Sequence, residues 1–106
     1  MSMDTDILTR PEQDQDLQYE EALEPLWRVL IHNDDETPYD FVIAILIRIF
    51  QLTPIIAEPI TLLAQTNGLA LVTTLPKSEA ENRVGKAHFA AQLEGFPLAF
   101  SIEPES

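Results

Sequence analysis

The stretch from Leu26 to Phe50 constrains the fold of this chain more than any other. It reads LWRVLIHNDDETPYDFVIAILIRIF, and it begins with Trp27, Val29 and Ile31 at every second position. Alternation of this kind, rich in β-branched and aromatic residues, is typical of a short and mostly buried strand. The sequence therefore predicts a strand that ends in front of an acidic turn.

The residues Asn33-Asp34-Asp35-Glu36 break the alternation, because Asn and Asp side chains bond the nearby backbone and favour turns. We expect Thr37 to cap the helix that follows, with Pro38 as its first residue and Asp40 completing a variant of the capping box. That helix should run over about residues 39–50, and its almost wholly apolar surface predicts that it is covered on all sides. A turn with three carboxylates and an amide suits an amine or a cation, although the same residues also fit a purely structural turn.

The run RVLIHNDDETPYDFV resembles the ClpS family of adaptor proteins. The family hallmark is a strand, an NDD-x-TP turn and a Phe-Val pair on the next helix. The corresponding residues here are Asn33-Asp34-Asp35, Thr37-Pro38 and Phe41-Val42. The resemblance covers about residues 26–103 without an insertion or deletion, although outside the turn it consists mostly of apolar spacing.

The remaining elements follow from periodicity and from helix start and stop signals. We expect helices over 55–66 and 79–93 and strands over 69–75 and 98–102. Thr53 and Ser78 are the expected caps, and Pro59 should kink its helix or delay the regular part to about Glu58. The order β-α-α-β-α-β predicts an α+β sandwich of a small sheet and three helices. Strand pairing cannot be read from the residues, but the resemblance implies an antiparallel three-stranded sheet.

Charge divides the chain of 106 residues into a tail and one small domain. Residues 1–25 carry seven of its twelve net negative charges and few large apolar residues, so they are predicted to be a flexible extension of the domain over 26–106. They contain no secretory signal, and we expect a cytoplasmic protein. From composition alone the extension could merely solubilise the chain. The resemblance implies instead that a partner unfoldase engages it.

Several classes of function are disfavoured by composition. A net charge of −12 argues against nucleic acid and anionic membranes as partners, and the absence of Cys excludes a thiolate zinc site. His32 and His88 belong to no catalytic motif, and the acidic turn does not match a calcium loop. We therefore predict no metal, no cofactor and no enzyme activity, with a small metal-dependent or hydrolytic enzyme as the weakest alternative.

The resemblance implies a binding function. ClpS-like proteins recognise a bulky hydrophobic N-terminal residue and hand the protein that bears it to a Clp-type ATP-driven unfoldase. Carried over by position, the ligands of the N-terminal amine are Asn33, Asp34, Asp35 and Gln65. The implied pocket residues are Thr37, Pro38, Tyr39, Val42, Thr61, Ala64 and Leu98, and the implied docking residues are Ser78, Glu79 and Arg83.

This chain departs from the family pattern at five of these positions. Gln65 replaces a His, Tyr39 replaces a Met at the pocket gate, and Thr61 is more polar than usual. Ser78 stands where the family has a docking Glu, with Glu79 one place later, and Arg83 stands at the family's Lys. The expected partners are an unfoldase and proteins with exposed N-terminal signals, and the expected state is a monomer or weak dimer. The alternative is a divergent module that docks on an unfoldase, or on another protein, without reading N-termini.

Overall fold

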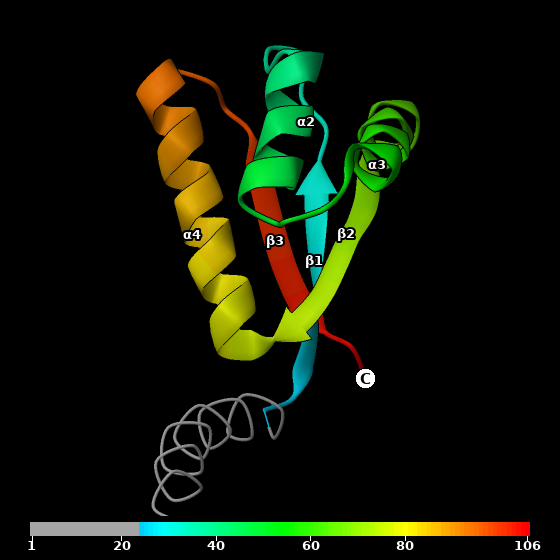
Figure 1. Cartoon of the computed structure of the whole chain (residues 1–106), viewed down its shortest axis with the longest axis vertical. Coiled ribbons are helices and arrows are strands. Elements are labelled where there is room, and N and C mark those ends of the chain that lie inside the picture. Colours follow the sequence, from blue (N-terminus) through cyan, green and yellow to red (C-terminus); the bar gives the residue numbers. More distant parts are fainter. Residues whose placement is uncertain (1–23) are drawn as a thin grey trace, which may run out of the picture.

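A central strand, β1 (Leu26–His32), organises the part of the chain that the structure describes, residues 24–106 of a computed structural model. The other elements are α2 (Tyr39–Arg48), α3 (Pro54–Asn67), β2 (Leu69–Pro76), α4 (Lys77–Glu94) and β3 (Ala99–Pro104) (Figure 1). The predicted order β-α-α-β-α-β is confirmed. None of these helices is long and apolar enough to cross a membrane.

The three strands form one sheet in the order β2-β1-β3, and both pairings are antiparallel. Val29 pairs with Thr73 on one side and Ile102 on the other. Val29 and Ile31 are 0% and 1% exposed, as the alternation along β1 predicted. The strand that leads into the acidic turn is thus the fixed centre of the sheet.

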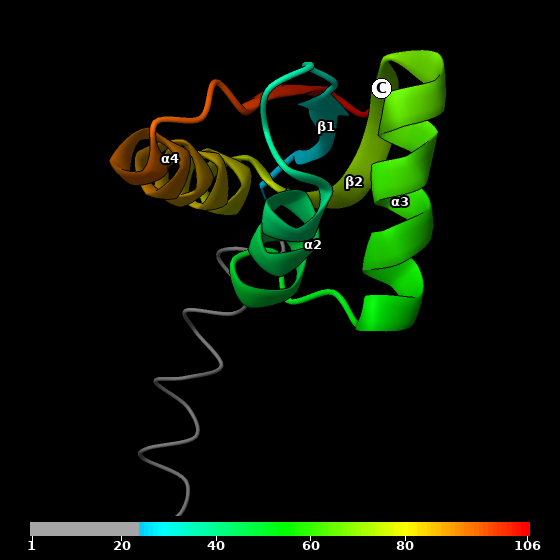
Figure 2. The ribbon, with the colours of Figure 1, turned by 90° about the horizontal axis from the view of Figure 1, so that it is seen from above.

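The helices lie on one side of this sheet (Figure 2). Helix α4 packs against β3, α3 packs against β2, and α2 lies between the other two helices. The buried core includes Leu46 from α2, Ala87 from α4 and Phe100 from β3. Helix α2 was predicted to be covered on all sides. This is wrong, because its Ile43 and Ala44 are only half-buried.

The start of α2 differs from the prediction. Pro38 is the N-cap residue with an extended backbone, and no side chain caps the helix. Thr37 lies one residue before the N-cap position, and its N–H and hydroxyl both donate to the Asp34 carboxylate. The capping box with Asp40 is therefore wrong as well, and the helix ends at Arg48, two residues earlier than predicted.

The start of α4 is also different, because Ser78 is not its cap. The helix begins at Lys77, and the N–H and hydroxyl of Ser78 donate to the two oxygens of Glu24 at 3.1 and 2.8 Å. The Lys77 N–H donates to the Pro25 carbonyl at 3.2 Å. A carboxylate is favourable at a helix N-terminus. Glu24 and Pro25, which the sequence analysis placed at the end of the extension, therefore contact the start of α4.

Helix α3 begins at Pro54 after Thr53 in the N-cap position, as predicted, although the Thr53 side chain makes no cap hydrogen bond. The helix continues through Pro59. The predicted delay of its regular part to about Glu58 is wrong, because the helix is regular from Pro54. Its C-cap is Gly68, whose φ of 84° is the left-handed conformation that glycine adopts most easily. This ending brings the last turn of α3 beside the acidic turn.

Candidate functional site

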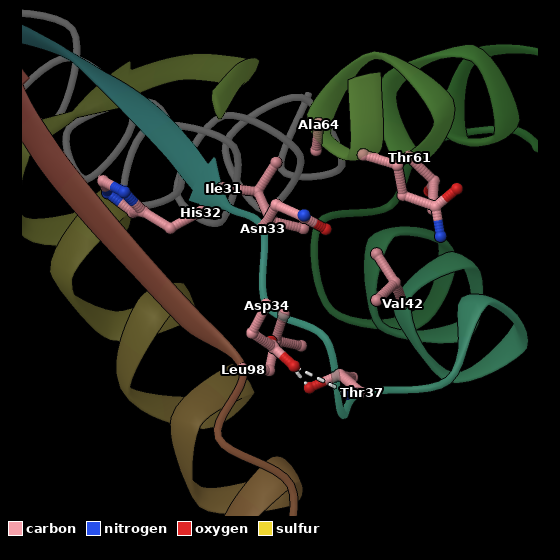
Figure 3. Close-up of a pocket in the computed structure, with 10 residues that line it drawn as sticks. Ile31, His32, Asn33, Asp34, Thr37, Val42, Thr61, Ala64 and Leu98 are labelled. Carbon is pink, nitrogen blue, oxygen red and sulfur yellow. Dashed lines mark hydrogen bonds between the residues drawn. The ribbon is translucent and has the colours of Figure 1, made fainter. Parts of the chain in front are cut away.

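A small pocket lies where the end of β1, the acidic turn, α2 and α3 meet (Figure 3). Eight of the predicted site residues line it: Asn33, Asp34, Thr37, Val42, Thr61, Ala64, Gln65 and Leu98. They come from three separate parts of the chain, and Leu98 lies just before β3. The fold therefore gathers most of the predicted amine ligands and pocket residues at one place.

Three predicted residues do not line this pocket: Asp35, Pro38 and Tyr39. Asp35 and Pro38 are exposed on the turn. The hydroxyl of Tyr39 lies 3.5 Å from the Glu58 carbonyl of α3, so the ring spans from α2 to α3.

Two lining residues, Ile31 and His32, were missed by the sequence analysis. Ile31 is the last inward side chain of β1, and the alternation of that strand was a signal that could have found it. The His32 ring points away from the pocket (Figure 3), and its Nε2 lies 2.6 Å from the Ser101 hydroxyl. His32 is therefore tied to β3, and no sequence signal indicated its place in the lining.

The acidic turn is held together by Asp34. Its Oδ1 accepts from the N–H groups of Glu36 and Thr37 at 2.8 and 2.6 Å, and its Oδ2 accepts from the Thr37 hydroxyl at 2.8 Å. The Asn33 N–H donates to the Gly68 carbonyl at 3.0 Å, which fastens the turn to the end of α3. A carboxylate has about four lone-pair positions, so Asp34 has little capacity left for a ligand.

Two opposing effects act on the pKa of Asp34. Partial burial raises the pKa of this carboxyl, but the hydrogen bonds from Thr37 and Glu36 outweigh burial and hold the pKa below its ordinary value. Asp34 is therefore ionised at neutral pH, and it places a fixed negative charge at the mouth of the pocket.

We expect Asp34→Ala to lower the free energy of unfolding by about 1–3 kcal/mol at pH 7, because three donors lose their acceptor. A lowered folded-state pKa stabilises the fold above the unfolded pKa, and this stabilisation is lost as pH falls through the folded value. The difference in the free energy of unfolding between the variant and the native protein, measured by urea denaturation, should therefore become smaller as the pH is lowered. Asp35→Ala, at an exposed neighbour, is the matched control. A difference that stays constant from neutral to strongly acid pH would contradict this account.

The interior of the pocket is apolar and tightly filled. Val42, Thr61, Ala64 and Leu98 are 8%, 2%, 3% and 5% exposed, and the Thr61 hydroxyl donates to the Ala57 carbonyl at 2.9 Å. The cavity volume is about 10 Å³, which is room for roughly one water molecule. A large side chain could enter only if the walls move apart.

The predicted docking residues lie together on the first turns of α4, and each has a partner within the chain. Ser78 is bonded to Glu24, and Glu79 pairs with Arg83 at 2.6 Å. Arg83 also donates through Nη1 to the Ile49 carbonyl at 2.9 Å, which joins α4 to the end of α2. Among residues 24–106, no group of three or more His, Asp or Glu side chains could hold a metal ion.

Comparison with known proteins identifies the family. The sequence model described as "ATP-dependent Clp protease adaptor protein ClpS" matches residues 22–101. The ATP-dependent Clp protease adapter protein ClpS of Desulfotalea psychrophila is 42% identical over 76% of this chain and 79% of its own. The adapter protein ClpS of Oleidesulfovibrio alaskensis is 41% identical over 94% of this chain and 96% of its own.

A solved structure supports the same assignment. The structure of Agrobacterium tumefaciens ClpS2 bound to L-phenylalaninamide matches this chain with a TM-score of 0.73 and 32% identity. The match covers 76% of this chain and 98% of that one. This chain belongs to the ClpS family of Clp protease adaptors.

Proposed function

We propose that this adaptor binds the free N-terminus of proteins whose first residue is bulky and hydrophobic, and that it delivers them to a Clp-type ATP-driven unfoldase. The observation that carries the proposal is one pocket in which Asn33 and Gln65 accompany a carboxylate above the apolar Val42, Ala64 and Leu98. L-phenylalaninamide, the molecule bound to Agrobacterium tumefaciens ClpS2, combines a free α-amine with a benzyl side chain. No covalent step is part of this function.

The amine would be held by acceptors at the pocket mouth. An α-ammonium group has three N–H donors, and hydrogen bonds from a charged donor are the strong ones. The side-chain carbonyls of Asn33 and Gln65 supply two acceptors, because both residues line the pocket and are exposed at its rim. Asp34 supplies the negative field and at most one remaining lone pair.

The first side chain would occupy the space between Val42, Thr61, Ala64 and Leu98. Since this space is almost filled in the free protein, binding would require the lining residues of α2 and α3 to move apart. Tyr39, which bridges these two helices, is positioned to control that opening. Tyr39 would then act through its contact with α3, since it does not line the pocket in the free protein.

We expect a short peptide that begins with phenylalanine to bind the native protein with micromolar or tighter affinity, measured by calorimetric titration. Gln65→Leu should weaken this binding by about 1–3 kcal/mol, as for a lost partner to a charged group. Gln65→His should strengthen it, because a neutral imidazole nitrogen accepts without the ambiguity of a flipped amide.

The control for this titration is Gln92→Leu, an exposed glutamine on α4 outside the pocket lining. If the native protein does not bind the peptide, the proposed function fails. The alternative, a divergent module that docks without reading N-termini, then becomes the better account. Full affinity in Gln65→Leu would instead remove Gln65 from the set of amine ligands.

Delivery would use the extension and the first turns of α4. Residues 1–23 lie outside the described part of the chain, so their predicted role in engaging the unfoldase remains a proposal from the sequence. Ser78, Glu79 and Arg83 stay candidates for docking. The partner would have to contact them while they keep, or exchange, the bonds to Glu24 and Ile49.

A further inference from the structure

Helix α3 places most of its large apolar side chains outside and its small ones inside. Ala57, Thr61 and Ala64 are its buried residues, whereas Ile55 and Leu62 are 82% and 56% exposed. The outer side is hollowed, and the hollow is lined by Pro54, Ile55, Glu58, Pro59 and Leu62. Apolar side chains gathered in an exposed hollow indicate an interaction surface.

The hollow continues the proposed peptide pocket along the same helix. Gln65 lines the pocket, and Leu62, three residues before it, lines the hollow, so the two side chains are neighbours on one helix face. Tyr39 marks the junction, because its hydroxyl meets the backbone of Glu58, which also lines the hollow. A chain leaving the pocket at Gln65 can therefore pass directly onto this surface.

We propose that the hollow holds the residues that follow the first one in the bound polypeptide, and that it favours apolar side chains there. This inference rests on the proposed function. An α-helix rises about 1.5 Å per residue, so Gln65 and Ile55 are about 15 Å apart along the axis. An extended chain rises about 3.3 Å per residue. The surface therefore matches about four to five residues after the first.

The charge distribution favours contact with apolar rather than charged residues. Glu58 is the only charged residue between Ile49 and Pro76, in a chain of net charge −12. A partner that binds by charge would find its attraction on other faces of the molecule. Selection at the hollow therefore depends on apolar contact, which scales with the area removed from water.

The test compares three ligands that share the first residue: L-phenylalaninamide, a peptide Phe-Leu-Ser-Leu-Ser and a peptide Phe-Ser-Ser-Ser-Ser. The native protein should bind the leucine peptide about 5- to 30-fold more tightly than the serine peptide. The double variant Ile55→Ser, Leu62→Ser should reduce the ratio of the affinities for the leucine and serine peptides to about one. Its affinity for L-phenylalaninamide should be unchanged. The matched control is Phe89→Ser, Leu93→Ser, since these α4 side chains are 62% and 70% exposed and should leave the ratio intact.

Each other outcome would overturn the inference. A ratio near one in the native protein, or an unchanged ratio in the double variant, would show that the hollow does not contact the peptide. If the hollow instead joins two copies of this chain, light scattering will give a dimer mass that the double variant loses, and peptide discrimination will be absent. Failure of L-phenylalaninamide to bind would remove the proposed function, and with it this inference, whereas binding without discrimination would remove the inference alone.

Discussion

Acetylation of the α-amine should lower the affinity of this protein for a phenylalanine-starting peptide by about 100-fold or more. Calorimetric titrations of the free and acetylated peptides, side by side, would measure this. The modification replaces a cation with three donors by a neutral amide with one. Hydrogen bonds to charged groups contribute about 1.5–3 kcal/mol each, and every 1.4 kcal/mol is a factor of ten in affinity. Losing the bonds to Asn33 and Gln65 together would account for this effect.

The control is the same peptide with an added lysine whose side-chain amine, rather than its α-amine, is acetylated. Its affinity should not change, because only the first amine reaches the pocket mouth. Equal binding of the free and α-acetylated peptides would contradict the proposal that the turn and α3 hold an amine. The pocket would then be at most an apolar site.

Deletion of residues 1–23 should abolish delivery, measured as degradation of a phenylalanine-starting substrate by the unfoldase and its protease. Peptide binding should survive, because every proposed ligand lies after Leu26. The composition of the deleted segment predicts that it buries little apolar surface, so the thermal midpoint should hardly change. A Gly/Ser segment of equal length should restore part of the delivery, since it offers the motor a chain to engage.

The position of the cut matters in this experiment. Removal of Glu24 and Pro25 as well should lower the thermal midpoint, because these residues accept the hydrogen bonds of Ser78 and Lys77 at the start of α4. The longer deletion therefore serves as a control for damage to the domain. Full degradation by the shorter deletion would show that the extension only solubilises the chain.

The strand, turn and helix over residues 26–50 could be predicted because their signals are local. Alternation sets the inward side of β1, and Asn33 to Pro38 supply the turn residues. The wrong cap assignments arose where side chains have competing partners. Thr37 suits a helix cap by its residue type, but it lies one residue before the N-cap position and is hydrogen-bonded to Asp34, three residues before it.

Other features depend on contacts that no local pattern contains. Ser78 was expected to act as a cap, whereas its partner is Glu24, which is 54 residues away. The pocket residues were grouped by family resemblance, since nothing in the periodicity brings Leu98 to Val42. The outward position of Ile55 and Leu62 was not predicted either, because apolar residues around a helix are normally expected to be buried.

We propose above all that the pocket between β1, α2 and α3 binds a free amine together with an apolar side chain. Titration of the isotope-labelled protein with L-phenylalaninamide, followed by amide NMR shifts, tests it most directly. We predict saturable shifts concentrated at Asn33, Ala64, Gln65 and Leu98, with none of comparable size when N-acetyl-L-phenylalaninamide is added. Shifts confined to α4, or the same shifts with both compounds, would contradict the account.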